Sequence, residues 1–335
     1  MMDGTRPQDD RRAAIVRFYD PAFINEYGRL EALRSVKFNV GFCVALVELC
    51  SPDGNTIGNL KTELPADAFK RLVAAVLGSV RSCDIAGTND GAHIVVVLPQ
   101  TDYFSALSRV KSLTEATDYL KKDKHGIKAA VSLATFPNDG KTFSDVVTTA
   151  LGRARDRTKS LWTEFEGKNK LFWEIIGDLF SRPHTGFENA CFDAGMGYDL
   201  TEFFLDQINE LVIKEIKRAP QRKGLLYISS KAISPALPVV KTLSSAGQIS
   251  TRIYLAGESD PGANLSEIKN ATPLLIDDPR LKEAFFNFFL NEHSAYALVC
   301  KENWGATFSC FHSCDRYLVE GLINSFRNEY GLGDQ

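Results

Sequence analysis

The strongest constraint on the fold is a regular alternation of short apolar runs with longer stretches of helical periodicity. In the first half, residues 41–49 and 94–98 have the length and apolar content of buried strands, and further strands are predicted near residue 85 and at 127–135. Helical periods cover 22–36, 66–80, 103–120 and 143–159. The order αβαββαβα predicts an α/β domain of the split-βαβ type, with helices on one face of a mixed sheet.

The first predicted helix has an apolar stripe. Phe23, Tyr27, Leu30 and Leu33 fall on one face of residues 22–36. Such a stripe is typical of a helix that packs on a core. We therefore expect this face to be buried against the sheet.

A second domain is predicted because 335 residues exceed what a single core usually holds. The polar stretch 163–170 has no apolar period, so we expect domains at 15–162 and 171–335. In the second domain, strands are predicted at 225–229, 252–256, 274–276, 295–301 and 306–311. Helices are predicted at 171–180, 200–217, 236–245, 281–290 and 317–329. This is a second α/β domain.

Charge and cysteine content limit the classes of partner. A net charge of -3 gives no electrostatic reason to expect nucleic acid or an anionic membrane as a partner. No apolar stretch approaches the roughly 20 residues of a membrane span, and residues 1–12 are polar. The seven cysteines show no paired framework, which favours reduced thiols in a cytoplasmic protein. Cys310 and Cys314 flank His312 without a second ligand pair, so no metal or other cofactor is expected.

The segment 80–102, VRSCDIAGTNDGAHIVVVLPQTD, carries the chemistry of the first domain. Arg81 and Asp84 precede a loop containing Asp90-Gly91-Ala92-His93, and an apolar strand follows. A small, glycine-containing loop of this kind lets a backbone approach a ligand. On the residues alone, Arg81 and Asp84 are explained equally well by a solvated i, i+3 ion pair.

The first domain resembles the GGDEF family, the diguanylate cyclases that join two GTP into cyclic di-GMP. The family's strand closes Leu-Pro-x-Thr-Asp, and the sequence has that pattern at 98–102. Counting back places Ile94 at the family's Phe and residues 90–93 at its Gly-Gly-Asp/Glu-Glu. The segments Val131-Ser132-Leu133-Ala134 and 150–160 stand where the family has a further strand and its last helix.

The resemblance implies that catalysis is lost. Asp90 puts bulk and negative charge where the family has a glycine that touches the nucleotide. His93 replaces a glutamate that binds the metal ion, and Mg²⁺ prefers oxygen ligands. Glu48 stands at the family's other metal carboxylate, so the two-metal arrangement is incomplete. Asp67 aligns with a guanine contact, although an acidic residue in the first turn of a helix explains it equally well.

The resemblance also implies a second nucleotide site. Arg81 and Asp84 match the family's Arg-x-x-Asp inhibitory motif, which binds cyclic di-GMP away from the catalytic centre. An arginine can donate to O6 and N7 of guanine, and a carboxylate can accept from its N1–H and N2–H. Thr88 stands where many members have a second arginine, which lowers the expected affinity.

Three functions follow as alternatives from this interpretation. The first is a non-catalytic cyclic di-GMP receptor that relays the signal to a protein partner. The second is a nucleotide-independent interaction scaffold, with homodimerisation left open. The third is a residual enzyme that binds GTP without turnover or completes an active site with another chain, which Asp90 and His93 argue against.

The second domain is similar in texture to small sensory domains of the GAF or DICT kind. The similarity lies in the order of strands and helices and in an expected hairpin around Trp304-Gly305. Trp173, Trp304 and the aromatic run at 285–289 could line a pocket, but aromatic residues in such a pattern are more often part of a core. We expect a sensory or interaction domain.

Overall fold

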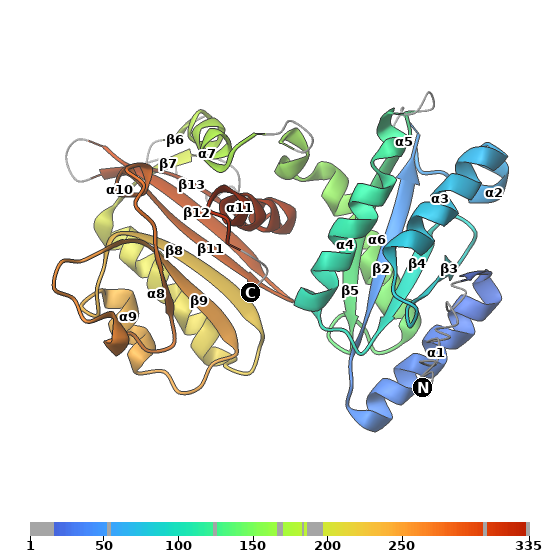
Figure 1. Ribbon diagram of the computed structural model, residues 1–335, viewed down its shortest axis with the longest axis horizontal. Helices are drawn as coiled ribbons and strands as arrows, with labels where there is room; N and C mark the ends of the chain where they lie inside the picture. The colour runs from blue at the N-terminus through green and yellow to red at the C-terminus, as the bar shows by residue number, and fades with distance from the viewer. Residues whose placement is uncertain are drawn as a thin grey trace, which may run out of the picture. The chain divides into compact units, whose positions relative to one another are not determined.

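The computed structural model describes residues 17–51, 55–122, 126–165, 170–182, 184–185, 197–303 and 307–332. The chain divides into two compact units, Met1–Lys159 and Ser160–Gln335. Each unit is an α/β structure with a mixed sheet (Figure 1). Among the described residues, no helix combines the length and the apolar character needed to cross a membrane.

The first unit follows the predicted order of helices and strands, with a short first strand and two short helices in addition. Its elements are β1 (Phe18–Tyr19), α1 (Pro21–Phe38), β2 (Phe42–Cys50), α2 (Leu60–Glu63), α3 (Ala66–Ser79), β3 (Ile85–Thr88), β4 (Ile94–Pro99), α4 (Tyr103–Thr117), α5 (Tyr119–Lys122), β5 (Lys128–Phe136) and α6 (Phe143–Lys159). The strand order is β1-β3-β4-β2-β5. Neighbouring strands are antiparallel except for β1 and β3. Because β4 lies between the mutually parallel β2 and β3, this is the predicted split-βαβ arrangement.

Helices cover both faces of this sheet, so the prediction of helices on one face is wrong. The side chains of β2 alternate between two clusters. Cys43, Ala45 and Val47 pack with the cluster of α3 and α4, whereas Val44 and Leu46 pack with that of α1 and α6. A strand that is buried on both faces needs a nearly continuous apolar run, and β2 has one.

The buried face of α1 also differs from the predicted one. Phe23, Leu30 and Leu33 are 41%, 45% and 56% exposed. The buried side carries Ile24 together with small and polar residues, namely Gly28, Glu31, Ala32 and Ser35. Gly28 permits close packing, because a Cβ there would lie 2.4 Å from the ring of Phe143 in α6. Most of the apolar stripe of α1 therefore faces away from the core, whereas its member Tyr27 is half-buried against the cluster of α1 and α6.

The second unit contains an eight-stranded sheet. Its elements are η1 (Leu161–Glu164), α7 (Phe172–Phe180), β6 (His184–Thr185), β7 (Gly197–Thr201), α8 (Glu202–Arg218), β8 (Gly224–Ile233), α9 (Pro238–Ser244), β9 (Thr251–Ser259), η3 (Leu265–Glu267), β10 (Thr272–Leu275), α10 (Arg280–Glu283), β11 (Ala284–Asn291), β12 (Ala295–Glu302), β13 (Thr307–Ser313) and α11 (Arg316–Glu329). The strand order is β10-β9-β8-β11-β12-β13-β7-β6. The pairs β8–β9, β9–β10 and β6–β7 are parallel and the other pairs are antiparallel.

The predicted helix at 281–290 is wrong, because these residues form α10 and most of β11, a strand in the middle of the sheet. Phe285 and Phe289 pack on the face covered by α8, whereas Phe286 and Phe288 contact Phe172 or Phe326 on the other face. Aromatic residues on both sides give no period of two, so the run looks helical in sequence. The same contacts confirm that these aromatic residues are core.

The structural break between the units precedes the polar stretch 163–170. Ser160 donates a hydrogen bond of 2.6 Å to Oδ2 of Asp315, the residue that caps α11. Trp162 lies against Gly321 of the same helix, where a Cβ would come within 2.2 Å of the indole. These contacts join η1 to the second unit.

Candidate functional site

The loop between β3 and β4 is closed upon itself by Asp90. Its Oδ1 accepts hydrogen bonds from the backbone N–H groups of Ala92 and His93, both at 2.9 Å. Its Oδ2 lies 2.7 Å from Nδ1 of His93. Burial alone would raise the pKa of Asp90, but these hydrogen bonds outweigh it and hold the pKa below the usual value.

Gly91 shapes this turn through its backbone. Its φ of +85° lies in the left-handed region, which favours glycine. A Cβ at Gly91 would meet open space, so glycine is favoured here by its backbone conformation and not by a lack of space for a side chain. The carbonyl of Gly91 accepts a 2.9 Å hydrogen bond from the backbone N–H of Leu60, which fixes the loop to the start of α2.

Glu48 lies beneath this loop, on β2, with only 1% of its side chain exposed. Thr56 Oγ1 donates to its Oε1 at 3.2 Å, and Nε of Arg155 in α6 lies 3.5 Å from the same oxygen. Nε2 of His93 is 3.8 Å away. The buried carboxylate therefore has an arginine, a hydroxyl and an imidazole of the protein itself around it, as a buried charge requires.

The structure brings together only some of the predicted positions of the vestigial centre. Glu48, Asp90 and His93 form one cluster, with Gly91 and Ala92 in the turn above it. Asp67 is elsewhere, in the first turn of α3, 72% exposed and 3.6 Å from Arg71. The described residues contain no group of three or more histidine, cysteine or acidic side chains arranged to hold a metal ion.

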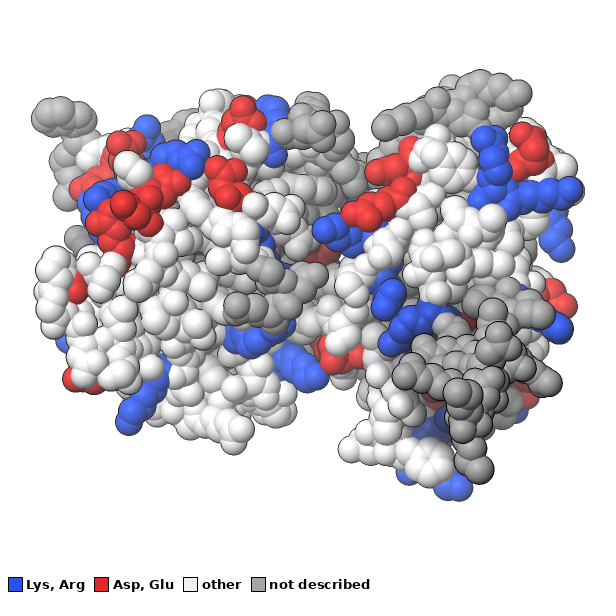
Figure 2. Space-filling view, viewed as in Figure 1, with Lys and Arg blue, Asp and Glu red and all other residues white. Residues whose placement is uncertain are grey.

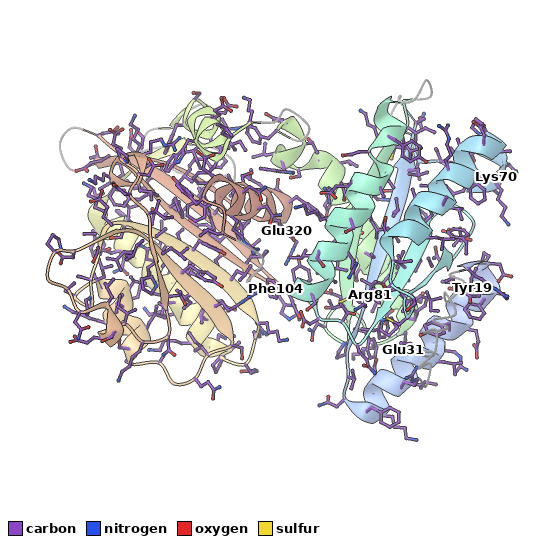
Figure 3. The ribbon with its side chains drawn as sticks, viewed as in Figure 1. Tyr19, Glu31, Lys70, Arg81, Phe104 and Glu320 are labelled. Atoms are coloured by element: carbon purple, nitrogen blue, oxygen red, sulfur yellow. The ribbon has the colours of Figure 1, made fainter. Side chains whose placement is uncertain are left out.

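Arg81 and Asp84 form the second predicted site, in the turn between α3 and β3 (Figure 3). Nη2 of Arg81 donates to Oδ1 of Asp84 at 2.8 Å, and Nε lies 3.1 and 3.2 Å from the two carboxylate oxygens. The backbone N–H of Arg81 adds a 2.8 Å bond to Oδ2. The interpretation of the two residues as a solvated ion pair is wrong for Asp84, because its side chain is 0% exposed. The side chain of Arg81 is 38% exposed.

Thr101 is a member of this site that the sequence did not single out. Nη2 of Arg81 donates to its Oγ1 at 2.8 Å, and that hydroxyl donates to the carbonyl of Pro99 at 2.9 Å. Thr101 belongs to the Leu-Pro-x-Thr-Asp close of the resemblance, which was the available signal. The hydrogen bond to Asp84 raises the pKa of Arg81 further, and the guanidinium is held in one orientation with part of its surface in solvent.

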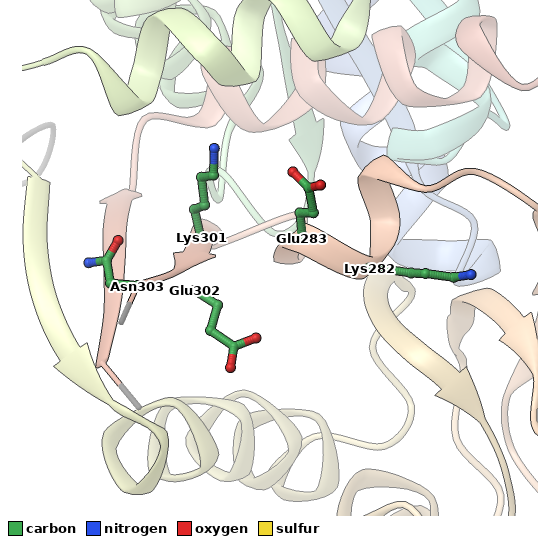
Figure 4. Close-up of a pocket in the computed structure, with 5 residues that line it drawn as sticks. All are labelled: Lys282, Glu283, Lys301, Glu302 and Asn303. Atoms are coloured by element: carbon green, nitrogen blue, oxygen red, sulfur yellow. The ribbon is translucent and has the colours of Figure 1, made fainter. Parts of the chain in front are cut away.

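The second unit has a hollow of 310 Å³ lined by Lys282, Glu283, Lys301, Glu302 and Asn303 (Figure 4). Its charges are balanced by neighbours: Lys231 lies 2.5 Å from Glu302, and Lys282 lies 2.6 Å from Glu258. Basic and acidic side chains are likewise interspersed on the face shown in Figure 2. The hollow is lined by both basic and acidic side chains, so its charge does not select a class of ligand.

Among known proteins, no protein-family model and no curated protein matches the chain. Solved structures of GGDEF domains are similar to less than half of it. A DGC protein from Thermotoga maritima aligns over 42% of this chain and 97% of its own, with 12% identity and a TM-score of 0.33. The GGDEF domain of DgcB from Caulobacter crescentus, in complex with c-di-GMP, aligns over 48% and 93%, with 9% identity and a TM-score of 0.32. The FimX GGDEF domain from Pseudomonas aeruginosa aligns over 42% and 88%, with 11% identity and a TM-score of 0.32.

Proposed function

We propose that this protein is a non-catalytic cyclic di-GMP signalling protein that binds the nucleotide through Arg81. The proposal rests on the way in which this arginine is held and exposed. Its guanidinium is fixed by a fully buried carboxylate and by Thr101, yet 38% of the side chain is exposed. Because the side chain is already ordered, little further entropy is lost when it binds a ligand.

The two residues of the pair have different roles in this proposal. Arg81 is the contact residue: its Nε and Nη2 donate to Asp84 and Thr101, which leaves Nη1 to donate to O6 or N7 of a guanine edge. Asp84 is a positioning residue, because its oxygens already accept from the side chain and backbone of Arg81. This refines the expectation from the sequence, in which both side chains touched the base. The choice of cyclic di-GMP rests on the Arg-x-x-Asp motif and its place before the loop.

The proposal of an inactive catalytic centre rests on the cluster of Glu48, Asp90 and His93. Asp90 occupies its oxygens with the loop itself, and Glu48 is engaged by Thr56 and Arg155. Binding of Mg²⁺ would require oxygen ligands in a near-octahedral arrangement. The cluster offers one buried carboxylate and an imidazole in that place.

Titration calorimetry tests the receptor proposal. Wild-type protein is titrated with cyclic di-GMP, with GTP and with buffer, and Arg81→Ala is compared under the same conditions. Loss of a hydrogen bond from a charged group is worth about 1.5–3 kcal/mol, so binding should weaken roughly 10- to 150-fold. Arg218→Ala, which removes an exposed arginine of α8, is the control and should bind like wild type.

Circular dichroism at the titration temperature must show that Arg81→Ala is folded. Absence of binding by wild type at high micromolar nucleotide, or equal binding by folded Arg81→Ala, would overturn the proposal. Asp84→Asn should weaken binding less than Arg81→Ala, since Asn keeps an acceptor for the guanidinium.

A nucleotide-independent scaffold is the second candidate, and the exposed stripe of α1 favours it. Val36 and Phe38 extend the stripe of Phe23, Leu30 and Leu33, and all five are exposed. An apolar patch of this kind marks an interaction surface, here for a second copy or a protein partner. Sedimentation of Leu33→Glu should then show loss of self-association, whereas Leu211→Glu, at an exposed leucine of α8, should behave like wild type. A wild-type monomer at all concentrations would exclude the homodimer.

In the receptor proposal, the second unit is the sensory or interaction domain that passes the signal to a protein partner in the cytoplasm. Its sheet is covered by helices on both faces, so the parts left for a partner are the outer surfaces of these helices, the loops and the sheet edges. A GAF or DICT relationship stays a prediction. Pull-down with residues 160–335 alone would separate partner binding from nucleotide binding.

A further inference from the structure

Two cysteines of the second unit face each other across the sheet. Cys300 in β12 and Cys310 in β13 are direct partners in an antiparallel pair. Directly opposed residues in such a pair have Cα atoms about 4.5–5.5 Å apart, and disulfides span about 4.4–6.8 Å. Both side chains belong to the cluster under α8, so they lie on the same face of the sheet. The backbone therefore already has the spacing of a cross-strand disulfide.

The two thiols are near enough to influence each other. Burial, and after it the neighbouring Cys310 thiol, raise the pKa of Cys300, and the thiol of Cys310 donates to the carbonyl of Phe308 at 3.4 Å. Both cysteines are free, with 1% and 2% of the residue exposed. Their surroundings are apolar, including Leu200, Leu205 and Leu298.

We infer that Cys300 and Cys310 form a dithiol site that hydrogen peroxide converts to a disulfide. A small, uncharged oxidant fits the site, because two buried thiols are out of reach of a bulky disulfide such as oxidised glutathione. Burial raises the pKa of the Cys300 thiol, so the thiolate is scarce at neutral pH and oxidation is slow compared with that of an exposed thiol.

The reaction balances with one peroxide per pair. One thiol gives up its proton, and its sulfur attacks a peroxide oxygen. The O–O bond breaks, the departing hydroxide takes up a proton as water, and a sulfenic acid remains. The sulfur of the second cysteine then attacks the sulfenic sulfur. The S–S bond forms, the S–O bond breaks, and the hydroxyl leaves with the second thiol proton as another water. Two thiols are oxidised and one peroxide is reduced.

Cys300 and Cys310 are directly opposed across two paired strands, and three of the other described cysteines have different surroundings. Cys43 is also buried, but its thiol donates to the backbone carbonyl of Thr101 at 3.0 Å. Cys83 and Cys314 are exposed. These cysteines are expected to give sulfenic or mixed products rather than an internal link. Cys191 lies outside the described residues.

The test uses the full-length, folded protein. It is exposed to hydrogen peroxide, its remaining thiols are blocked with an alkylating reagent under denaturing conditions, and peptides are mapped by mass spectrometry without reduction. The expected product is one peptide pair joined through Cys300 and Cys310, lighter by two hydrogen atoms and separated by a reductant. Thermal unfolding should shift to higher temperature after oxidation and return after reduction, because the link closes the β12–β13 hairpin.

Cys314→Ser should form the link as wild type does, whereas Cys300→Ala and Cys310→Ala should not. Circular dichroism identifies any variant that fails to fold, and the wild-type map decides the question without them. Full alkylation of Cys300 and Cys310 after exhaustive peroxide treatment would overturn the inference. A link from either cysteine to Cys314 or Cys83 in its place would do the same.

Discussion

Nδ1 of His93 lies 2.7 Å from Oδ2 of Asp90, so the loop between β3 and β4 is held by two of its own side chains. The first prediction concerns this closure. Asp90→Ala removes the acceptor of two backbone N–H groups and the partner of His93, and we expect a loss of about 1–2 kcal/mol in the free energy of unfolding. Asp90→Asn keeps the Oδ1 acceptor and should lose less. Chemical denaturation at pH 7 measures both.

The pH dependence of this loss has a definite sign. The folded-state pKa of Asp90 is lowered, so its stabilisation is present above the unfolded value of about 4 and is lost as the pH falls through the folded value. The difference between wild type and Asp90→Ala should therefore shrink in acid. A difference that grows below pH 4 would contradict this.

The second prediction concerns the contribution of the Arg81–Asp84 pair to the stability of the fold. Arg81→Ala leaves a fully buried carboxylate without its main partner, and we expect a loss of about 3 kcal/mol. Arg81→Lys keeps a positive charge but not the planar fork, so its loss should be intermediate. In a double-mutant cycle with Asp84→Asn, the coupling should exceed about 1 kcal/mol. Coupling near zero would show that the pair is energetically a surface pair.

The contrast between these two sites shows what the sequence could and could not predict. The order of elements from β2 to α6 was predictable because strands and helices there have clear lengths and periods. The burial of Asp84 and the hydrogen bond from Arg81 to Thr101, 20 positions away, were not predictable, because both arise from tertiary packing. The participation of Arg155 in the Glu48 cluster likewise depends on how α6 packs on the sheet.

Two errors have a common physical origin. The sequence placed the apolar face of α1 in the core, but close packing against Phe143 selects the side that carries Gly28. The sequence also predicted a helix over residues 281–290, where the structure has β11, because aromatic residues fill both faces of this strand. In both cases tertiary packing overrides the local pattern, and a single sequence contains no direct record of it.

The third prediction tests the packing of α1. Gly28→Ala should cost about 1–2 kcal/mol, because the overlap with the Phe143 ring outweighs the higher helix propensity of alanine. Gly152→Ala in α6, where a Cβ meets open space, should instead stabilise by about 0.5–1 kcal/mol. Thermal unfolding of the two variants gives the comparison. Equal effects of the two substitutions would show that α1 does not approach Phe143 closely.

The fourth prediction concerns Asp278 in the second unit. The hydrogen bond from Arg280 and that from the hydroxyl of Tyr330, both 2.7 Å to Oδ2, lower the pKa of Asp278 to about 2. Asp278→Asn should cost about 2 kcal/mol at pH 7, and the difference should disappear as the pH falls from about 4 to 2. Asp206→Asn, at an exposed position of α8, is the control and should change stability little. If Asp278→Asn still lowers the free energy of unfolding at pH 2, the loss comes from the shape of the side chain rather than from its charge.

The last prediction concerns catalysis. Wild-type protein incubated with GTP and Mg²⁺ or Mn²⁺ should form no cyclic di-GMP above a protein-free control, because the oxygens of Asp90 are engaged within the loop and an imidazole is a poor ligand for these ions. The combined variant Asp90→Gly, Ala92→Asp, His93→Glu should gain Mn²⁺ binding, measured by calorimetry. The reason is geometric: His93 Nε2 is 3.8 Å from Oε1 of Glu48, so a carboxylate in its place would lie beside the buried one. His93→Gln is the matched control, since it has similar bulk without the charge and should gain no metal binding. Product formation by wild type would refute the loss of catalysis, and failure of the combined variant to bind Mn²⁺ while folded would show that Arg155 keeps Glu48 from serving as a ligand.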